Sequence, residues 1–311
     1  MKGRRVLVTG GSGFIGSHLV RRLVQMGAEV YLLSRNRSVI DNIRLKDVWS
    51  KLRVVNADIR NFDSLSQLEN LEPEIVFHLA AYHHVGDSFT HFSEALDTNC
   101  LGTSNLLEAL EDYNRFVYTS TSEVYGHQPS VPFKEEMTPH PISPYAIGKY
   151  AGELYCLMKH EMGYPITVLR PFNVYGPYQS AEALIPEIIS NCLAGRPIRA
   201  TEGRQTREFN YIDDTIDGFV RAAQINDAIG KIINLGSGEE ISIKDLILKI
   251  AKLTDTKSEV SFGALPYRPT EIWRMFCDNT KATEILDWTP KTNLEKGLQR
   301  TVLWFKEHGD F

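Results

Sequence analysis

Residues 4–16 read Arg4-Arg5-Val6-Leu7-Val8-Thr9-Gly10-Gly11-Ser12-Gly13-Phe14-Ile15-Gly16, and this stretch decides the fold. The apolar run from Arg4 to Val8 predicts a short buried strand. A helical spacing of apolar residues then runs from Phe14 to Met26, with Gly27 as its stop. Residues 29–33 are the next expected strand. A strand, a glycine turn, a helix and a second strand in this order are typical of a dinucleotide site.

Each glycine of the Gly10-x-x-Gly13-x-x-Gly16 motif has a physical role in such a site. Gly10 would permit the tight turn, and Gly13 would let a pyrophosphate approach the N-terminus of the helix. Gly16 would allow the helix to pack closely on the strand. The alternative is a glycine-rich turn that binds no ligand.

The composition excludes several classes of protein. The 311 residues carry a formal net charge of −5 and are 42% hydrophobic, with no basic run that would indicate a nucleic-acid partner. No apolar run reaches membrane-spanning length. The four cysteines are scattered and show no C-x-x-C spacing, so we expect reduced thiols in a cytoplasmic protein and no metal site. They are Cys100, Cys156, Cys192 and Cys277.

Strands and helices alternate along the first half of the chain. Further strands are expected at residues 52–57, 74–79, 116–120 and 166–170, and helices at 94–111 and 144–162. This alternation predicts an α/β fold with a doubly wound parallel (Rossmann) sheet. Beyond it we expect helices at 185–193, 241–253 and 294–307, and strands at 209–212 and 232–235.

Two units follow from this pattern. Residues 1–172 would form the dinucleotide-binding domain, with a later strand near 209–238 returning to it. Residues 173–208 and 239–311 would form a smaller C-terminal substrate-binding lobe over the carboxyl ends of the strands, where doubly wound folds bind ligands.

The end of the second strand bears on the choice of cofactor. An acidic residue there would bond the ribose 2′-hydroxyl and repel a 2′-phosphate. This chain has Ser34-Arg35-Asn36-Arg37 instead, and the guanidiniums of Arg35 and Arg37 favour NADP slightly over NAD. The alternative is that both arginines are solvated and the protein binds NAD.

A second motif lies in the helix expected after Ser143, which is a good N-cap, with Pro144 as first helical residue. Tyr145 and Lys149 are four residues apart and share one face of that helix. A free phenol has a pKa near ~10 and is a poor base, but a nearby ammonium would lower that pKa. Such a pair could take a proton from a substrate hydroxyl. Tyr-x-x-x-Lys alone is a weak signal, because chance pairs at this spacing are common.

Together, the glycine motif, Thr121 after the fifth strand and Tyr145-x-x-x-Lys149 resemble the extended short-chain dehydrogenase/reductase family. Over nearly its whole length the chain is similar to the nucleotide-sugar epimerases and dehydratases of that family. Supporting stretches include His78-Leu79-Ala80-Ala81, residues 170–177 and Arg207-Glu208-Phe209. On the family's pattern the cofactor, recycled at each turnover, would be held by Gly10, Gly13, Phe14, Ile15, Gly16, Ser34, Arg35, Arg37, Asp58, Ile59, Leu79, Ala80, Ala81, Asn99, Thr119, Tyr145, Lys149 and Pro171.

Three stretches resemble 4,6-dehydratases in particular. Thr121-Ser122-Glu123 is similar to the Thr-Ser-Glu of GDP-mannose 4,6-dehydratases, and residues 84–89 are similar to a loop of dehydratases. Residues 179–186 resemble dehydratases acting on nucleotide-linked N-acetylglucosamine. UDP-glucuronate decarboxylases also show Thr-Ser-Glu, and some 4-epimerases have a Ser-Glu-Val-Tyr-Gly run. A 4-epimerase, a decarboxylase and a non-catalytic cofactor-binding regulator therefore remain alternatives.

The resemblance implies a catalytic set of Thr121, Glu123, Tyr145 and Lys149. Tyr145 would take the proton of the C4 hydroxyl, Thr121 would bond the C4 oxygen, and Glu123 would remove the C5 proton. A nucleotide-diphosphate sugar would contact His84, Ser122, Asn173, Arg207 and Arg268. The mechanism requires no metal. By analogy with similar proteins, helices 94–111 and 144–162 would pair in a four-helix bundle of a homodimer.

Overall fold

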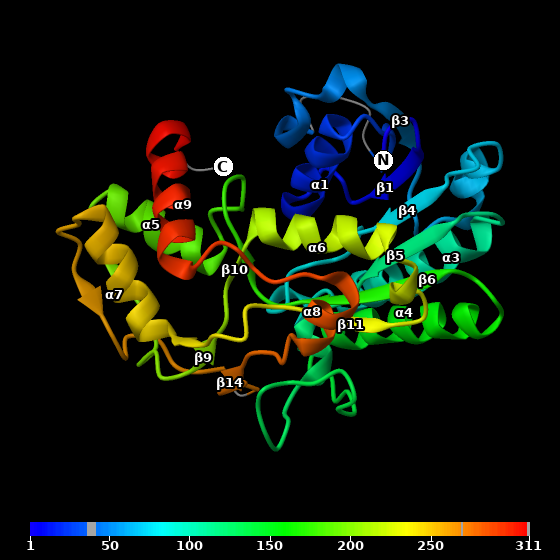
Figure 1. Cartoon of the computed structure of the whole chain (residues 1–311). Helices are drawn as coiled ribbons and strands as arrows, with labels where there is room; N and C mark the ends of the chain where they lie inside the picture. Colours follow the sequence, from blue (N-terminus) through cyan, green and yellow to red (C-terminus); the bar gives the residue numbers. More distant parts are fainter. Residues whose placement is uncertain (36–41, 269, 310–311) are drawn as a thin grey trace.

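A computed structural model describes residues 1–35, 42–268 and 270–309. Its centre is a seven-stranded, wholly parallel sheet in the order β11-β6-β5-β4-β1-β2-β3 (Figure 1). The strands are β1 (Arg5–Thr9), β2 (Glu29–Ser34), β3 (Arg53–Asn56), β4 (Ile75–His78), β5 (Arg115–Thr119), β6 (Ile166–Pro171) and β11 (Ile232–Leu235). The predicted doubly wound parallel sheet is confirmed. The strand order reverses between β1 and β4, and such a reversal is where these folds bind ligands.

Both faces of the sheet are buried. Successive strand residues point to opposite faces, so each strand contributes to the apolar packing on both sides. Val6 and Val8 of β1 belong to one apolar cluster, and Leu7 belongs to another, all with no exposed surface. The first cluster includes residues of α1 (Phe14–Gln25) and α6 (Ile212–Gln224). The second includes residues of α3 (Gly102–Ala109) and α4 (Pro144–Glu161). Helices therefore cover both faces, which explains the continuous apolar runs of the strands.

The helix that carries Tyr145 begins where the sequence predicts. The hydroxyl of Ser143 accepts the backbone N–H of Ala146 over 3.1 Å, and Pro144 is the first helical residue. Glycines allow α4 to lie close to the preceding helical segment. A Cβ on Gly148 would lie 3.0 Å from Cβ of Asn99, and one on Gly152 would lie 2.7 Å from the Asn99 carbonyl oxygen. The predicted helix over 94–111 is found as α2 (Phe92–Leu96), a π-helical segment (Asp97–Leu101) and α3.

The strand predicted at residues 209–212 is shorter in the structure, and the helix that follows it is not predicted from the sequence. The strand β10 contains only Asn210–Tyr211, and α6 begins at Ile212. Ile212, Ile216, Phe219 and Val220 form the buried face of α6, which packs against α1. The short run of residues 209–212 predicts a strand, whereas the longer helical spacing that begins at Ile212 determines the structure.

A smaller group of elements, built mainly from the C-terminal third, lies beside the sheet (Figure 1). Its helices α5 (Leu184–Leu193), α7 (Ile243–Thr254) and α9 (Leu294–His308) pack on one another, while α8 (Thr280–Leu286) contacts β11. Short strands complete it: β7 (Val174–Tyr175) with β10, β8 (Ile198–Arg199) with β13 (Val260–Ser261), and β9 (Thr206–Arg207) between β12 (Ile241–Ser242) and β14 (Arg274–Met275). In the described residues we find no helix that is both long and apolar enough to cross a bilayer.

Candidate active site

The glycine turn at the end of β1 is packed so tightly that two of its glycines have no substitute. Gly10 has φ +69°, and a Cβ there would lie 2.5 Å from the backbone nitrogen of Ala80. A Cβ on Gly16 would collide with the carbonyl oxygen of Gly10. The turn thus brings the ends of β1 and β4 together beneath the first turn of α1, as the motif predicts.

The N-terminus of α1 fits the phosphates of a dinucleotide. Gly13 is the N-cap and provides no side-chain hydrogen bond to the first turn, and that turn contains no acidic residue. A Cβ on Gly13 would come within 4 Å of a single atom outside its chain neighbours, the Gly10 oxygen at 3.3 Å. The first backbone N–H groups of α1 and its positive dipole end therefore suit an anion.

Most other predicted cofactor residues gather at this edge of the sheet. Leu79, Ala80 and Ala81 follow β4, Thr119 ends β5, and Pro171 ends β6. The hydroxyl of Thr119 is buried with no hydrogen-bond partner in the protein, as expected of a group available to a ligand. Asn99 is committed to the protein, because its side-chain amide exchanges hydrogen bonds of 2.8 and 3.0 Å with the backbone of Tyr82.

The predicted cofactor residues near the ends of β2 and β3 show fewer features that indicate a ligand. Ser34 ends β2, and Arg35 is exposed with its carbonyl accepting from Asn56 over 2.7 Å. Arg37 lies outside the described residues. Asp58 pairs with Arg60 over 2.7 Å, and buried Ile59 packs against Gly102.

Thr121, Glu123 and Tyr145 come together after β5. The hydroxyl of Thr121 accepts the backbone N–H of Glu123 over 3.2 Å, and the N–H of Tyr145 donates to Ser88 over 3.2 Å. Burial raises the pKa of Tyr145 to about 12; interaction with Thr121 lowers it and the Glu123 carboxylate raises it. Burial also raises the pKa of Glu123. A carboxyl group with a raised pKa is suited to accepting and then releasing a proton.

Lys149 lies one turn along α4 in a buried environment. Its ammonium stands 4.4 Å above the ring of Tyr118, and burial lowers the pKa of Lys149 to about 7. The pKa of Tyr145 is shifted by burial, Thr121 and Glu123, and the action of Lys149 on the phenol stays a prediction. Burial disfavours the charged form of Lys149, and Glu123 raises the pKa of Tyr145, whereas a nearby positive charge would lower it.

Arg207 and Arg268 reach the same cluster from the C-terminal part of the chain. Both lower the pKa of Glu123, so both guanidiniums act on its carboxylate. Arg207 donates to Glu271 over 2.6 Å and to the carbonyl oxygens of Thr206 and Ile272 over 2.8 and 2.6 Å. Arg268 is exposed. A fixed guanidinium beside an accessible one suits a diphosphate.

Three other predicted substrate residues have partners within the protein. The side chain of Asn173 donates to the carbonyl oxygen of Glu208 over 3.1 Å, beside Arg207. The buried hydroxyl of Ser122 donates to the sulfur of Met275 over 3.4 Å. His84 accepts the N–H of Asp87 over 3.2 Å in the loop after β4, and that loop also contains Ser88.

Sequence reasoning missed the carboxylates that surround the predicted residues. Glu271 contacts Arg207 and raises the pKa of Glu123. It lies only three residues after Arg268, which the sequence does predict as a substrate residue. Glu153 follows Lys149 by four residues, a helical spacing that could have indicated it. Among the described residues, we find no group of three or more His, Cys, Asp or Glu that could hold a metal ion.

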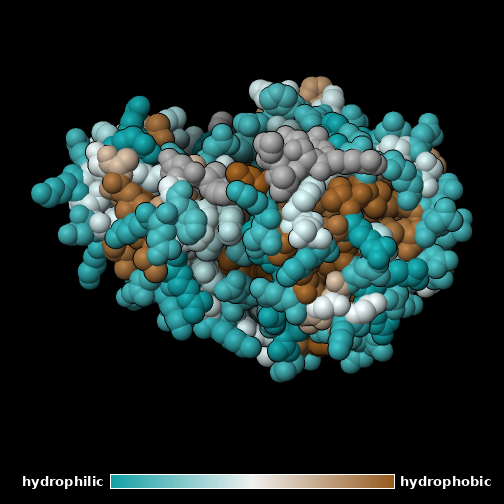
Figure 2. All heavy atoms as spheres, turned by 90° about the horizontal axis from the view of Figure 1, so that it is seen from above, coloured by the Kyte–Doolittle hydropathy of each residue, from teal (hydrophilic) through white to brown (hydrophobic). Residues whose placement is uncertain are grey.

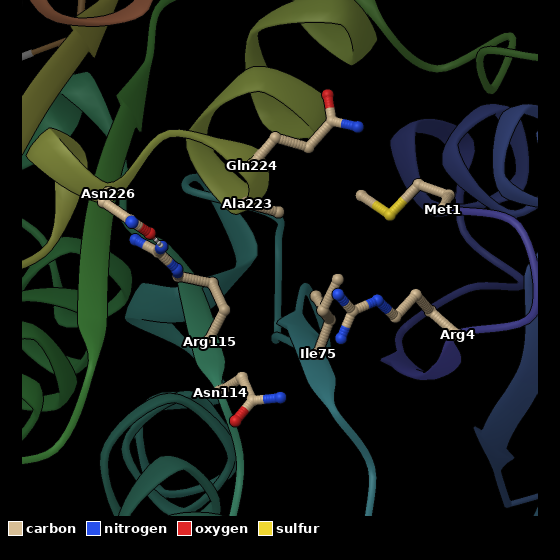
Figure 3. A pocket seen from close by; sticks show the side chains of 8 residues that line it. All are labelled: Met1, Arg4, Ile75, Asn114, Arg115, Ala223, Gln224 and Asn226. Carbon is tan, nitrogen blue, oxygen red and sulfur yellow. Dashed lines mark hydrogen bonds between the residues drawn. The ribbon is translucent and has the colours of Figure 1, made fainter.

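A cavity of about 490 Å³ lies at the opposite end of the sheet (Figure 3). Arg115 on its wall donates to the carbonyl oxygen of Ile225 and to the Asn226 side chain over 3.1 and 3.0 Å, and so caps the C-terminus of α6. Arg4 faces the cavity and pairs with Glu74. These arginines have structural partners, and the cavity lies at the amino ends of β1, β4 and β5, away from the site above.

Comparison with known proteins assigns the family. The family described as GDP-mannose 4,6 dehydratase matches residues 7–301. The chain belongs to this family. It is therefore an enzyme of the nucleotide-sugar epimerase and dehydratase group, and the resemblance seen in the sequence is confirmed.

Three similar proteins carry names of different reactions. UDP-glucose 4-epimerase of Mycolicibacterium smegmatis is 37% identical, with 97% of this chain and 98% of that protein covered. UDP-N-acetyl-alpha-D-glucosaminuronate decarboxylase of Bacillus cytotoxicus is 33% identical, with 98% of both covered. The solved UDP-glucuronic acid 4-epimerase of Bacillus cereus, in complex with UDP-glucuronic acid and NAD, is 33% identical with a TM-score of 0.89 and 99% of both chains covered. Family membership thus shows an enzyme of the nucleotide-sugar epimerase and dehydratase group, but it does not determine which of these reactions the enzyme catalyses. The complex holds NAD and does not support the preference for NADP.

Proposed function

We propose that this family member is a 4,6-dehydratase that converts a nucleotide-diphosphate hexose to its 4-keto-6-deoxy derivative. The observation that supports this best is the position of the Glu123 carboxylate, which acts electrostatically on Tyr145 beside Thr121. An oxidation at C4 needs only Tyr145, Lys149 and Thr121, so an additional carboxylate with a raised pKa calls for a second proton transfer.

In the first step Tyr145 takes the proton of the C4 hydroxyl, and Thr121 hydrogen-bonds the oxygen as it becomes a carbonyl. When bound, the oxidised nicotinamide would accept the C4 hydride and later return it at C6. The phenol has a pKa of about 12 in the protein alone, so added positive charge from Lys149 is needed to make it a base.

In the second step Glu123 removes the C5 proton, which the C4 carbonyl has acidified. The C5–C6 double bond forms as the C6 hydroxyl leaves, and Glu123 delivers its newly gained proton to that hydroxyl to form water. Ser122 is a poor donor for this purpose, because its hydroxyl is directed to the Met275 sulfur and is not acidic. One carboxyl group therefore acts first as base and then as acid. As hydride returns to C6, C5 takes up a proton from water, and Tyr145 releases to water the proton that it took from the C4 hydroxyl, so the enzyme is restored.

A 4-epimerase is the second candidate, and the position of Ser122 favours it. If the leaving hydroxyl receives no proton, the 4-keto sugar can turn over in the site and accept hydride on the opposite face of C4. The similar proteins named as 4-epimerases point the same way. In this reaction Glu123 would have no required role.

For binding, we propose that Arg207 and Arg268 hold the diphosphate and that Asn173 contributes a polar contact beside them. We propose NAD as the cofactor, because NAD occupies the similar solved epimerase. A comparison of the affinities for NAD and NADP tests this choice. At least tenfold tighter binding of NADP would restore the preference that Arg35 and Arg37 predict.

We also propose a homodimer formed through α4 and the helix before it. Apolar side chains reach the surface in several patches (Figure 2), so exposure alone does not mark an interface. Along α4 and at its C-cap, however, exposed apolar residues recur at helical spacing on one face: Ile147, Leu154, Met158 and the C-cap residue Met162. Phe92 and Leu101 of the adjoining helical segments are exposed as well.

Incubation of the purified protein and NAD with a panel of nucleotide-linked hexoses and N-acetylhexosamines tests the proposed reaction. A dehydratase releases a 4-keto-6-deoxy sugar, which is lighter than its substrate by one water in mass spectra. Interconversion of two hexoses of unchanged mass would instead establish the epimerase.

A further inference from the structure

A buried ion pair lies directly behind the Tyr145–Lys149 pair. Glu153 is one turn beyond Lys149 on the same face of α4 and has no exposed surface. Arg170 of β6 donates to both of its carboxylate oxygens, through Nη2 over 2.5 Å and Nε over 3.1 Å. Ser120, the residue before Thr121, donates its hydroxyl to Glu153 over 2.6 Å. The carboxylate therefore joins α4 to the ends of β5 and β6.

Stability alone does not account for this arrangement. A buried ion pair loses so much hydration that apolar residues of the same volume are often equally stable. Its location is more informative, because Tyr145, Lys149 and Glu153 are spaced at i, i+4 and i+8 and the ends of β5 and β6 border the candidate active site. The pair thus holds the Glu153 carboxylate at a fixed position one helical turn from Lys149.

The other titratable groups around Lys149 are neutral or already paired at neutral pH. Burial raises the pKa of the Cys156 thiol and of the Tyr118 phenol well above their usual values. Burial and the Lys149 charge lower the pKa of His78. Arg170 is charged, and its charge is met by Glu153. Cys156 and Glu153 would both favour the ammonium form of Lys149 when charged, and because the Cys156 thiol stays neutral, the Glu153 carboxylate is the negative charge present at neutral pH.

We propose that Glu153 is a positioning residue of the proposed reaction: it favours the charged form of Lys149 against the effect of burial, and Lys149 in turn makes Tyr145 a base. The inference rests on the proposed role of the Tyr145–Lys149 pair. It does not depend on whether the oxidised sugar is then dehydrated or epimerised, because both routes begin with the same proton transfer.

The test is an NMR titration of lysine side chains in the whole protein, labelled with carbon-13 at Cε. The Lys149 signal is assigned by its absence in Lys149→Met. In Glu153→Gln the Lys149 midpoint is expected to fall by at least about one pH unit. Since Glu153→Gln leaves the Arg170 charge unmatched, the double variant Glu153→Gln/Arg170→Met is measured too. It is expected to show a smaller fall in the same direction and to fold without a lone buried charge.

Glu108→Gln serves as the matched control. Glu108 also contacts a lysine of α4, Lys159, over 3.2 Å, but lies away from the site, so this substitution should leave the Lys149 midpoint unchanged. An unchanged midpoint in the folded double variant would overturn the proposal. If the panel of sugars shows no dehydration while the Lys149 midpoint shifts as expected, the proposed reaction fails and this inference stands.

Discussion

Glu208 and Cys277 are joined across the C-terminal part of the chain: the backbone N–H of Cys277 donates to the Glu208 carboxyl group over 3.1 Å, and the thiol lies 3.5 Å from its other oxygen. The N–H of Gly238 donates to the same group over 3.0 Å. Glu208 follows Arg207 directly and is fully buried. One carboxyl group thus holds the segment carrying Arg207 against the loop after β11 and the end of β14.

This contact predicts a pH dependence of stability. Burial raises the pKa of Glu208 to about 7 from an ordinary value of 4.5. Below pH 4.5 the group is protonated in both folded and unfolded chains, whereas between pH 4.5 and 7 the unfolded chain ionises first, so stability falls as pH rises. The fall is at most about 3 kcal/mol and ends near pH 7. Glu208→Gln should flatten this part of the curve in chemical denaturation measured at several pH values.

Glu240→Gln is the control for that measurement. Glu240 pairs with Arg274 beside the small sheet of β12, β9 and β14, and this pairing lowers the pKa of Glu240. Its substitution therefore removes a contribution to stability that rises with pH, whereas substitution of Glu208 removes one that falls with pH. A curve for Glu208→Gln as steep as that of the native protein would contradict the prediction.

Tyr145→Phe removes the phenol hydroxyl and keeps the ring. We expect turnover to fall by about 10² to 10⁴, because a general base contributes that much. Cofactor affinity, measured by fluorescence titration, should change little. Unchanged turnover would remove the assignment of Tyr145 as the base.

Glu123→Gln separates the two candidate reactions. The amide cannot take the C5 proton, so exchange of C5 hydrogen with deuterated water and formation of the deoxy sugar should both fall by about 10² or more. Transient reduction of the cofactor should persist, since Tyr145 and Thr121 are intact. In an epimerase the same substitution would leave the interconversion rate within a few-fold.

Gly16→Ala tests the packing of the glycine turn. The added methyl group would collide with the Gly10 carbonyl oxygen, so we expect loss of cofactor binding and a lowered melting temperature. Gly86→Ala is the matched control, because a Cβ there would meet no atom closer than 3.6 Å and the residue has an ordinary φ. Equal cofactor affinity in the two variants would contradict the role given to the turn.

Leu154→Lys tests the proposed dimer. Leu154 is 48% exposed in the middle of the apolar face of α4, so a charge there should halve the mass measured by light scattering. Leu248→Lys, at a comparably exposed leucine of α7, should leave the mass unchanged. A monomeric native protein at micromolar concentration would refute the dimer.

The sheet was predictable from the sequence because its signals are local. Each strand is a short apolar run bounded by turn residues, and Ser143 with Pro144 marks the start of α4. The helix α6 was missed although Ile212, Ile216, Phe219 and Val220 have helical spacing, because a two-residue strand precedes it directly.

The contacts around the site were less accessible to sequence reasoning. Arg207 and Glu271 are 64 residues apart, and Glu208 and Cys277 are 69 apart, so neither pair leaves a local signal. The raised pKa of Tyr145 arises from burial, which the local sequence pattern around Tyr145 does not indicate. The motifs thus indicated which residues come together, and packing determined the pKa values of those residues.

The path of the chain between the sheet and the smaller lobe bears on how new specificities can evolve. After β6 the chain contributes to the lobe, returns for α6 and β11, and then leaves again for α7. Several lobe segments are therefore anchored at both ends. We expect insertions between these anchors to alter sugar selectivity and to leave the glycine turn at the end of β1 intact.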